Sequence, residues 1–242
     1  MSLRRFILEM PPQASVAVLT GSEAYHLSRV LRARPGQSVE VTDGSGSVWR
    51  GRVGTIEPNS VEVVELELLA SHSSAIPITL IQSLCRSEKL DWILEKVTEI
   101  GVSEIFLLQA ERSVVRLSAE RISHKMARWT KILTSAAKQS HNSRLPLLHA
   151  PCSIPEICGA VRSRAKFLMA EDEKQTTLKA ALRSDQPDSV TFCIGPEGGW
   201  TPAESEHFCR HGFRPVSLGS NILRTETAAI VVAGILKYEL TG

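Results

Sequence analysis

Near the carboxyl end of the chain, three glycines follow a short apolar run. Residues 192–194 (FCI) have the composition of a buried strand, and they run into residues 195–200 (GPEGGW). Because glycine has no Cβ, such a loop lets a ligand come close to the backbone. The loop lacks the GK[ST] of phosphate-binding loops and does not fit GxGxxG, which argues against a nucleotide phosphate as the ligand. The spacing alone is also compatible with an ordinary glycine-rich connection between a strand and a helix.

A second connection of this kind follows at residues 216–229 (VSLGSNILRTETAA). Within it, Arg224 stands directly before an apolar helix. A cation there faces the positive end of the helix dipole, which predicts an anionic partner, with bracing of the loop as the alternative role. Glu226 lies in the first helical turn, where the dipole favours a carboxylate without any function. The sequence therefore favours Arg224 over Glu226 as a residue that takes part in chemistry.

From residue 76 onward, short apolar runs alternate with helix-length amphipathic segments. This alternation predicts an α/β fold with a mostly parallel sheet and helices on both faces, in which ligands bind beyond the carboxyl ends of the strands. Residues 201–204 (TPAE) predict a capping box with proline at the first helical position. The expected strands are residues 78–83, 104–108, 166–170, 190–194 and 215–218. The expected helices are residues 88–100, 118–140, 154–161, 176–183, 202–211 and 225–240.

The first 70 residues have a different pattern. Alternation typical of strands occurs at residues 38–41, 47–56 and 60–68, and one amphipathic helix begins with Ser22 as its N-cap. Residues 43–46 (DGSG) predict a hairpin turn between the first two of these strands. Residues 71–74 (SHSS) read as a linker. The chain is therefore expected to hold a small β-rich domain at residues 1–70 and an α/β domain at residues 76–242.

The two C-terminal loops, taken together, resemble the C-terminal motifs of the SPOUT methyltransferase superfamily. More narrowly, they are similar to those of the ribosomal RNA small subunit methyltransferase E family, the uridine-N3 enzymes. Residues 95–102 (EKVTEIGV) and 111–113 (ERS) are similar to further motifs of this family. Residues 26–32 and 43–46 resemble its small PUA-like RNA-binding domain. The resemblance covers nearly the whole chain.

This resemblance implies methylation of a uridine N3 in 16S ribosomal RNA of the assembled small subunit, with S-adenosylmethionine as donor and without a metal. It also implies a trefoil-knotted C-terminal domain and a homodimer whose active site lies close to the partner subunit. Arg224 and Glu226 are the expected catalytic residues. The expected donor-binding residues are Ile194, Gly195, Pro196, Glu197, Gly198, Gly199, Leu218, Gly219, Ile222 and Leu223. The expected RNA-binding residues are Arg5, His26, Arg29, Arg32, Arg112 and Arg144.

One stretch departs from the family's pattern. Where the family tends to read QSGR, this chain has QSHN at residues 139–142, and Arg144 follows two residues later. If the missing arginine contacts RNA, Arg144 and His141 are its candidate substitutes. From Glu111 to Arg144, eight lysines and arginines stand against two acidic residues, in a chain whose net charge is only +2. Such a local excess of positive charge suits RNA phosphates.

Composition argues against several other classes of protein. The five cysteines are scattered without a CxxC pair, which indicates reduced thiols. His207 and His211, with Cys209 between them, lack a glutamate and a third ligand cluster, so no metal site is expected. No segment matches a signal peptide or a membrane span, which predicts a cytoplasmic protein. The last helix, residues 225–240, is apolar almost all round, which predicts burial in a homodimer.

Two other function classes stay open. One is a non-catalytic ribosome-assembly factor that keeps the fold, and the intact loops disfavour it. The other is a SPOUT enzyme that acts on a different RNA, such as a transfer RNA ribose. The N-terminal domain and the sequence LRTETA at residues 223–228 disfavour that alternative.

Overall fold

The computed structural model describes residues 3–71, 76–185 and 187–240. The chain forms two compact units: an N-terminal unit of residues 1–74 with 134–145, and a C-terminal unit of residues 75–133 with 146–242. Residues 72–74 of the expected linker lie outside the described residues. The segment 134–145 packs with the N-terminal unit, whereas the sequence reading placed it in the α/β domain.

The N-terminal unit is built on a five-stranded sheet. Its strands are β1 (Arg5–Ile7), β2 (Ala17–Thr20), β3 (Ser38–Thr42), β4 (Ser47–Ile56) and β5 (Ser60–Ser71). They lie in the order β1-β3-β4-β5-β2, with β3 and β4 paired as the predicted antiparallel hairpin. The sequence reading missed β1 and β2, because strands of three and four residues are too short to show clear alternation. Apolar side chains from all five strands form one buried core.

Helix α1 (Gly21–Tyr25) passes directly into a π-helical turn, η1 (His26–Val30). Thr20 is the N-cap of α1, so the predicted N-cap at Ser22 is wrong by two residues. Within this helical segment, Ala24 and Leu27 are buried in the core, while Arg29 is exposed. Turns of the π type often occur at functional sites.

Backbone hydrogen bonds explain why residues 141–145 belong to the N-terminal unit. The Leu145 N–H donates to the Gly44 carbonyl at 2.9 Å, and the Gly46 N–H donates to the Ser143 carbonyl at 3.1 Å. These bonds attach the QSHN region to the DGSG hairpin turn, two motifs that lie about a hundred residues apart. Local sequence patterns carry no signal for such a contact, so the sequence reading could not assign the segment correctly.

The C-terminal unit contains a six-stranded sheet in which every neighbouring pair is parallel, as predicted. Its strands are β6 (Ile78–Ser83), β7 (Glu104–Leu108), β8 (Leu147–Leu148), β9 (Ala165–Met169), β10 (Val190–Ile194) and β11 (Arg214–Val216). They lie in the order β11-β9-β10-β6-β7-β8. The helices of the remaining chain are α2 (Ser87–Ile100), α3 (Ala119–Gln139), α4 (Ile154–Ala160), α5 (Leu178–Asp185), α6 (Pro202–Arg210) and α7 (Thr225–Leu240). Apart from the two-residue β8, each had been predicted to within two residues at either end.

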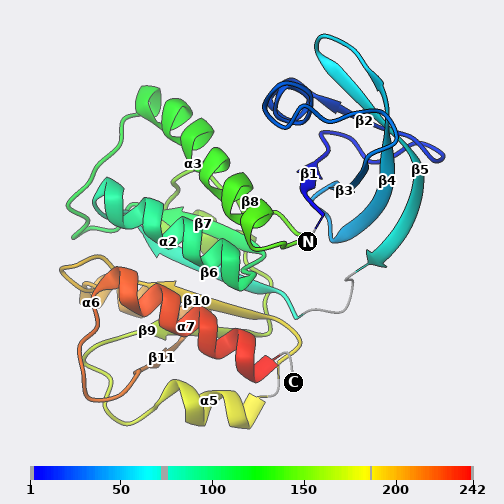
Figure 1. The fold of residues 1–242 in the computed structure, drawn as a ribbon. Coiled ribbons are helices and arrows are strands. Elements are labelled where there is room, and N and C mark those ends of the chain that lie inside the picture. Colours follow the sequence, from blue (N-terminus) through cyan, green and yellow to red (C-terminus); the bar gives the residue numbers. More distant parts are fainter. Residues whose placement is uncertain (1–2, 72–75, 186, 241–242) are drawn as a thin grey trace. The chain divides into compact units, whose positions relative to one another are not determined.

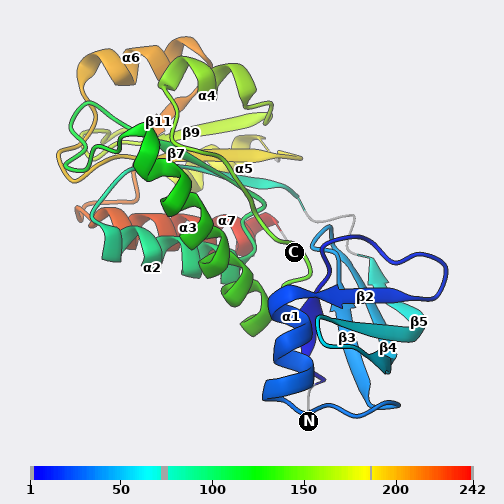
Figure 2. The ribbon, with the colours of Figure 1, turned by 90° about the horizontal axis from the view of Figure 1, so that it is seen from above.

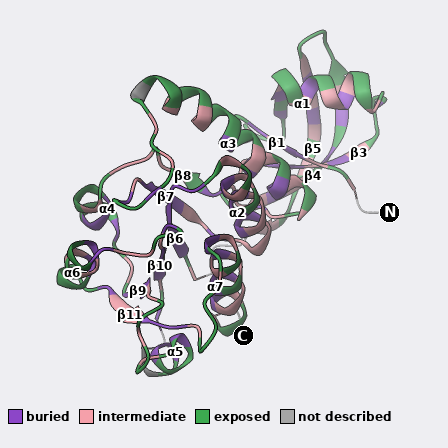
Figure 3. Ribbon diagram, turned by 90° about the vertical axis from the view of Figure 1, so that its left-hand side faces the viewer, coloured by how far each residue is buried: buried purple, intermediate pink, exposed green. Residues whose placement is uncertain are grey.

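Helices cover both faces of this sheet (Figure 1). α2 and α7 pack side by side on one face, and α4 and α6 pack together on the other (Figure 2). Buried residues concentrate along the strands and on the helix sides that face them (Figure 3). α6 begins at the predicted capping box, which is confirmed: the Thr201 hydroxyl accepts from the Glu204 N–H at 3.2 Å. Among the described residues, no helix is both long and apolar enough to span a membrane.

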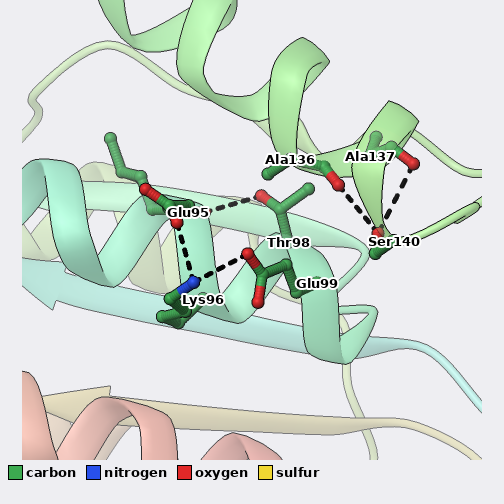
Figure 4. A network of polar contacts seen from close by, with 8 residues as sticks. Glu95, Lys96, Thr98, Glu99, Ala136, Ala137 and Ser140 are labelled. Atoms are coloured by element: carbon green, nitrogen blue, oxygen red, sulfur yellow. Dashed lines mark hydrogen bonds and ion pairs between the residues drawn. The ribbon is translucent and has the colours of Figure 1, made fainter.

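The motif at residues 95–102 forms the end of α2 (Figure 4). The Lys96 ammonium lies 2.7 Å from the Glu95 carboxylate and 2.8 Å from the Glu99 carboxylate. Gly101 follows with a φ of 100°, in the left-handed region that glycine adopts without strain. The charged residues of this motif therefore pair with one another, and its glycine ends the helix.

Candidate active site

Three loops meet at the carboxyl ends of the neighbouring strands β9, β10 and β11. The Trp200 indole N–H donates to the Met169 carbonyl at 3.0 Å, which ties the loop after β10 to the end of β9. The Thr225 hydroxyl, at the start of α7, donates to the Gly195 carbonyl at 2.9 Å. Hydrogen bonds between distant segments thus hold the three loops together. The trefoil knot that the resemblance implies stays a prediction.

The three loops, with side chains from elsewhere in the C-terminal unit, line a cavity of about 590 Å³. This volume lies within the range of cofactor pockets. Nine of the ten residues predicted to bind the donor line the cavity: Ile194, Gly195, Pro196, Glu197, Gly199, Leu218, Gly219, Ile222 and Leu223. Of the two predicted catalytic residues, Arg224 lines the cavity and Glu226 does not.

Gly198, the tenth predicted residue, faces Arg112 and not the cavity. A Cβ at position 198 would lie 3.2 Å from the Cβ of Arg112. The Arg112 guanidinium donates to the Gly198 carbonyl at 3.0 Å and to the Trp200 carbonyl at 3.3 Å. The absence of a side chain at this glycine therefore makes room for Arg112, and a direct contact between Gly198 and the donor stays a prediction. Arg112, expected to bind RNA, braces the loop and lines the cavity.

Sequence reasoning missed part of the cavity wall. Glu171 and Asp172, in the loop after β9, both line the cavity. Two acidic residues directly after a predicted strand were a signal that could have identified them, because ligands bind at the carboxyl ends of parallel strands. Lys89, on α2, also lines the cavity, and no local pattern pointed to it.

Lys89 holds two carboxylates in place. Its ammonium lies 3.2 Å from Glu197 and 3.3 Å from Glu226. Desolvation by itself would lower the pKa of Lys89, but its hydrogen bonds to the two carboxylates outweigh this and raise the pKa above the usual lysine value. Burial, assisted by the charge of Glu197, raises the pKa of the nearby Cys85 thiol to about 12. The cysteine is therefore a neutral thiol, and Glu226 is the partner of a lysine.

Arg224 differs from Lys89 in its surroundings. Its backbone carbonyl accepts from the Ala228 N–H at 2.8 Å, which places it at the start of α7. Its side chain is exposed at the cavity, and among the described residues it makes no hydrogen bond or ion pair. The next residue, Thr225, is buried and accepts a hydrogen bond from the Gln82 amide at 3.2 Å. The backbone next to Arg224 is thus fixed, while its guanidinium stays available.

The residues predicted to bind RNA in the N-terminal unit fall into two groups. Arg5 pairs with Glu40 at 3.0 Å, with side chains only 12% and 13% exposed, and it also donates to the His141 carbonyl. His26 is half-buried, with the edge of its ring against Phe6. Half-buried Arg144 lies in the segment held by the hairpin turn. Arg29 and Arg32, by contrast, are exposed.

Comparison with models of known protein families identifies the class of protein to which this fold and this cavity belong. The model of the RNA methyltransferase domain matches residues 72–237, and the model of the RNA methyltransferase PUA domain matches residues 19–66. The chain is therefore an RNA methyltransferase with an N-terminal PUA domain.

Its relatives narrow this class. Ribosomal RNA small subunit methyltransferase E of Mycobacterium bovis is 30% identical over 95% of this chain and 88% of its own length. The enzyme of the same name from Bacillus subtilis is 29% identical over 98% of this chain and 97% of its own length. A crystal structure of a ribosomal RNA small subunit methyltransferase E from Neisseria gonorrhoeae, bound to S-adenosylmethionine, matches with a TM-score of 0.84 and 29% identity over 98% of both chains. The chain belongs to the ribosomal RNA small subunit methyltransferase E family.

Proposed function

We propose that this chain transfers a methyl group from S-adenosylmethionine to N3 of a uridine in 16S ribosomal RNA. The proposal depends mainly on the cavity of about 590 Å³ that is lined by the loops after β9, β10 and β11. The exposed side chain of Arg224 lines this cavity. The Neisseria gonorrhoeae structure, similar over 98% of both chains, holds this donor. Family membership supports small-subunit ribosomal RNA as the substrate, and the family resemblance supports the uridine N3.

The lining of the cavity fits the donor. Ile194, Leu218 and Leu223 supply apolar surface, and the glycines of the loops expose backbone groups that can bind the polar parts of a nucleoside. Glu171 and Asp172 add carboxylates, which accept hydrogen bonds from ribose hydroxyls or from an ammonium group. These groups would hold the donor without a metal.

The donor supplies an already activated methyl group, so the protein's main task is to position the uracil in line with it. The N3 proton must leave as the methyl arrives, which places negative charge on the ring. The exposed Arg224 guanidinium is suited to stabilise that charge or to hold a neighbouring phosphate. Glu226 pairs with Lys89, so we assign it to positioning instead of to proton transfer. Stabilising the deprotonated ring would allow solvent to accept the N3 proton.

The proposal extends to partners and location. Arg29 and Arg32, whose side chains are exposed in the N-terminal unit, would contact RNA phosphates. α7 carries Tyr238 with 82% of its surface exposed, together with the exposed Val231, which supports a homodimer that buries this helix. Light scattering at micromolar concentration should then give twice the chain mass. A ribosomal RNA substrate implies that the enzyme acts in the cytoplasm.

Methylation of purified small subunits, from cells that lack the gene, tests the proposal. With labelled donor, one methyl group per subunit should be incorporated, and digestion with mass spectrometry should identify 3-methyluridine. A methyl on N3 blocks base pairing, so primer extension should stop next to the modified base. Free 16S RNA and transfer RNA serve as parallel substrates. Methylation of transfer RNA, methylation at another atom, or donor binding without transfer to any RNA would each contradict the proposal.

A further inference from the structure

Away from the cavity, the structure brings together three side chains that bind transition metals. Cys158 lies on α4, and His207 and His211 lie at the end of α6, where these two helices pack against each other. One potential ligand atom from each residue lies within 4.8 Å of the other two. The sequence showed only the two histidines, because the cysteine that completes the set lies 49 residues earlier. The helices thus supply the third ligand that the sequence reading found missing.

Each of the two histidines has a ring nitrogen that makes no hydrogen bond to a described residue and can bind a cation. The His211 Nδ1 lies 2.9 Å from the His207 carbonyl, and since a carbonyl can only accept, Nδ1 carries the proton. In the neutral ring, Nε2 then has the lone pair. Metal-binding histidines commonly donate their other nitrogen to a backbone carbonyl in this way. The His207 Nε2 is buried and makes no hydrogen bond among the described residues.

Cys158 is buried where α4 packs against α6, with only 6% of its surface exposed. Lys166 is a neighbouring positive charge that weakens cation binding. Its ammonium, however, lies 5.5 Å from the centre of the Phe213 ring and donates to the His211 carbonyl.

We propose that Cys158, His207 and His211 form a binding site for Zn²⁺ or a chemically similar divalent cation. Zinc accepts one sulfur and two nitrogens in tetrahedral geometry, with water in the fourth position. The thiol proton leaves to solvent as the Zn–S bond forms. Bond lengths of about 2.0–2.3 Å require the ligand atoms to move together by roughly 1 Å, a shift that the exposed His211 side chain can supply.

Occupancy would clamp α4 to α6. α6 starts directly after the loop that lines the donor cavity, and the Trp200 ring of that loop packs edge-on against Phe208 of α6 at 5.3 Å. The cation would therefore stabilise the helix that supports this loop. None of the three ligand residues lines the cavity, so the proposal does not depend on the proposed methyl transfer.

Cobalt titration of the full-length protein, without a histidine tag and freed of metal by a chelator, tests the ligands directly. Co²⁺ bound by a thiolate gives a sulfur-to-metal charge-transfer absorption, which should saturate at one equivalent. Cys158→Ser should abolish that absorption. Cys209→Ser is the matched control, because this exposed cysteine lies on α6 between the two histidines yet outside the cluster. It should leave the absorption unchanged.

Competition with Zn²⁺ then measures affinity. His211→Gln, a change at an exposed side chain that should not disturb folding, should weaken Zn²⁺ binding by about 100-fold or more. Zn²⁺ at a hundred times its dissociation constant should raise the melting temperature of the wild type by about 5 °C, and should not raise that of His211→Gln. The proposal is overturned if His211→Gln binds Zn²⁺ like the wild type, or if the wild type gives no charge-transfer absorption. It is also overturned if Cys209→Ser, and not Cys158→Ser, removes that absorption.

Discussion

The cavity and the N-terminal unit each contain cations of two kinds, and their comparison separates architecture from function. In the cavity, Lys89 holds Glu197 and Glu226, whereas Arg224 is exposed. In the N-terminal unit, Arg5 holds Glu40, whereas Arg29 and Arg32 are exposed. A lysine or arginine that forms an ion pair inside the protein helps to stabilise the fold, so its removal should lower stability. An exposed cation at a binding surface should act on the substrate, and its removal should leave the fold intact.

The sharpest test of this distinction is Arg224→Ala. We expect methyl transfer to fall by a few hundred-fold, about the 3–4 kcal/mol that one preorganised donor to a developing negative charge contributes. Donor affinity and melting temperature should change little, since neighbouring Thr225 fixes the backbone. Arg224→Lys should restore little activity, because an ammonium cannot reproduce the planar fork. If binding, stability and activity fell together, Arg224 would be a paired, bracing residue and the comparison would fail there.

The N-terminal unit allows the same comparison between its own arginines. Arg5→Ala leaves Glu40 without its main partner in a largely buried position, so we expect a decrease of about 3 kcal/mol in unfolding free energy. The double change Arg29→Ala with Arg32→Ala should leave stability unchanged and weaken binding to the small subunit by about tenfold. It should also reduce the salt dependence of binding by about one released counterion for each arginine that touches a phosphate. Denaturant unfolding and binding titrations at several salt concentrations measure these effects. If Arg5→Ala instead weakened binding to the small subunit and left stability unchanged, Arg5 would be an RNA-binding residue.

Variants at Arg112 and Gly198 test whether an arginine that is hydrogen-bonded to the loop affects donor binding by holding that loop in place. Gly198→Val forces a side chain against Arg112, which should disturb the loop and weaken donor binding by about tenfold. If Gly198→Val weakens donor binding by displacing Arg112, then Arg112→Ala should weaken donor binding by a similar factor. The double variant should bind the donor only slightly more weakly than either single variant. Calorimetry with S-adenosylmethionine measures all three. Additive losses would instead indicate a direct contact between Gly198 and the donor.

The smallest expected effect concerns Lys89. Its pKa is raised in the folded protein above the ordinary value of 10.5. For a lysine with a raised pKa, the stabilising contribution is present below the unfolded pKa and is lost as pH rises through the folded pKa. The difference in melting temperature between the wild type and Lys89→Met should therefore be constant from pH 7 to 9 and shrink above about pH 10.5. A difference that stayed unchanged to higher pH would show that Lys89 stabilises the fold by packing alone.

Much of the C-terminal unit could be predicted from the sequence. The strands β6, β7 and β10 and the capping box at Thr201 follow from patterns within a few residues, and such local preferences survive in the folded protein. Two of the three loops of the cavity could be identified for the same reason, since each is a continuous stretch that follows a strand. The start of α1 was misplaced, because both Thr20 and Ser22 are acceptable N-caps and the choice depends on the sheet beneath.

Only the tertiary structure decided which residues meet across the chain. It paired Lys89 with Glu226, Arg5 with Glu40 and Cys158 with the histidines of α6, and it attached residues 141–145 to the hairpin turn. These partners stand 35 or more residues apart, so no local pattern relates them. Whether a charged residue braces the fold or meets a substrate depends on such partners. The sequence by itself therefore determined most elements of the C-terminal unit and two of the three loops at the cavity, while packing determined which charged side chains remain available to a substrate.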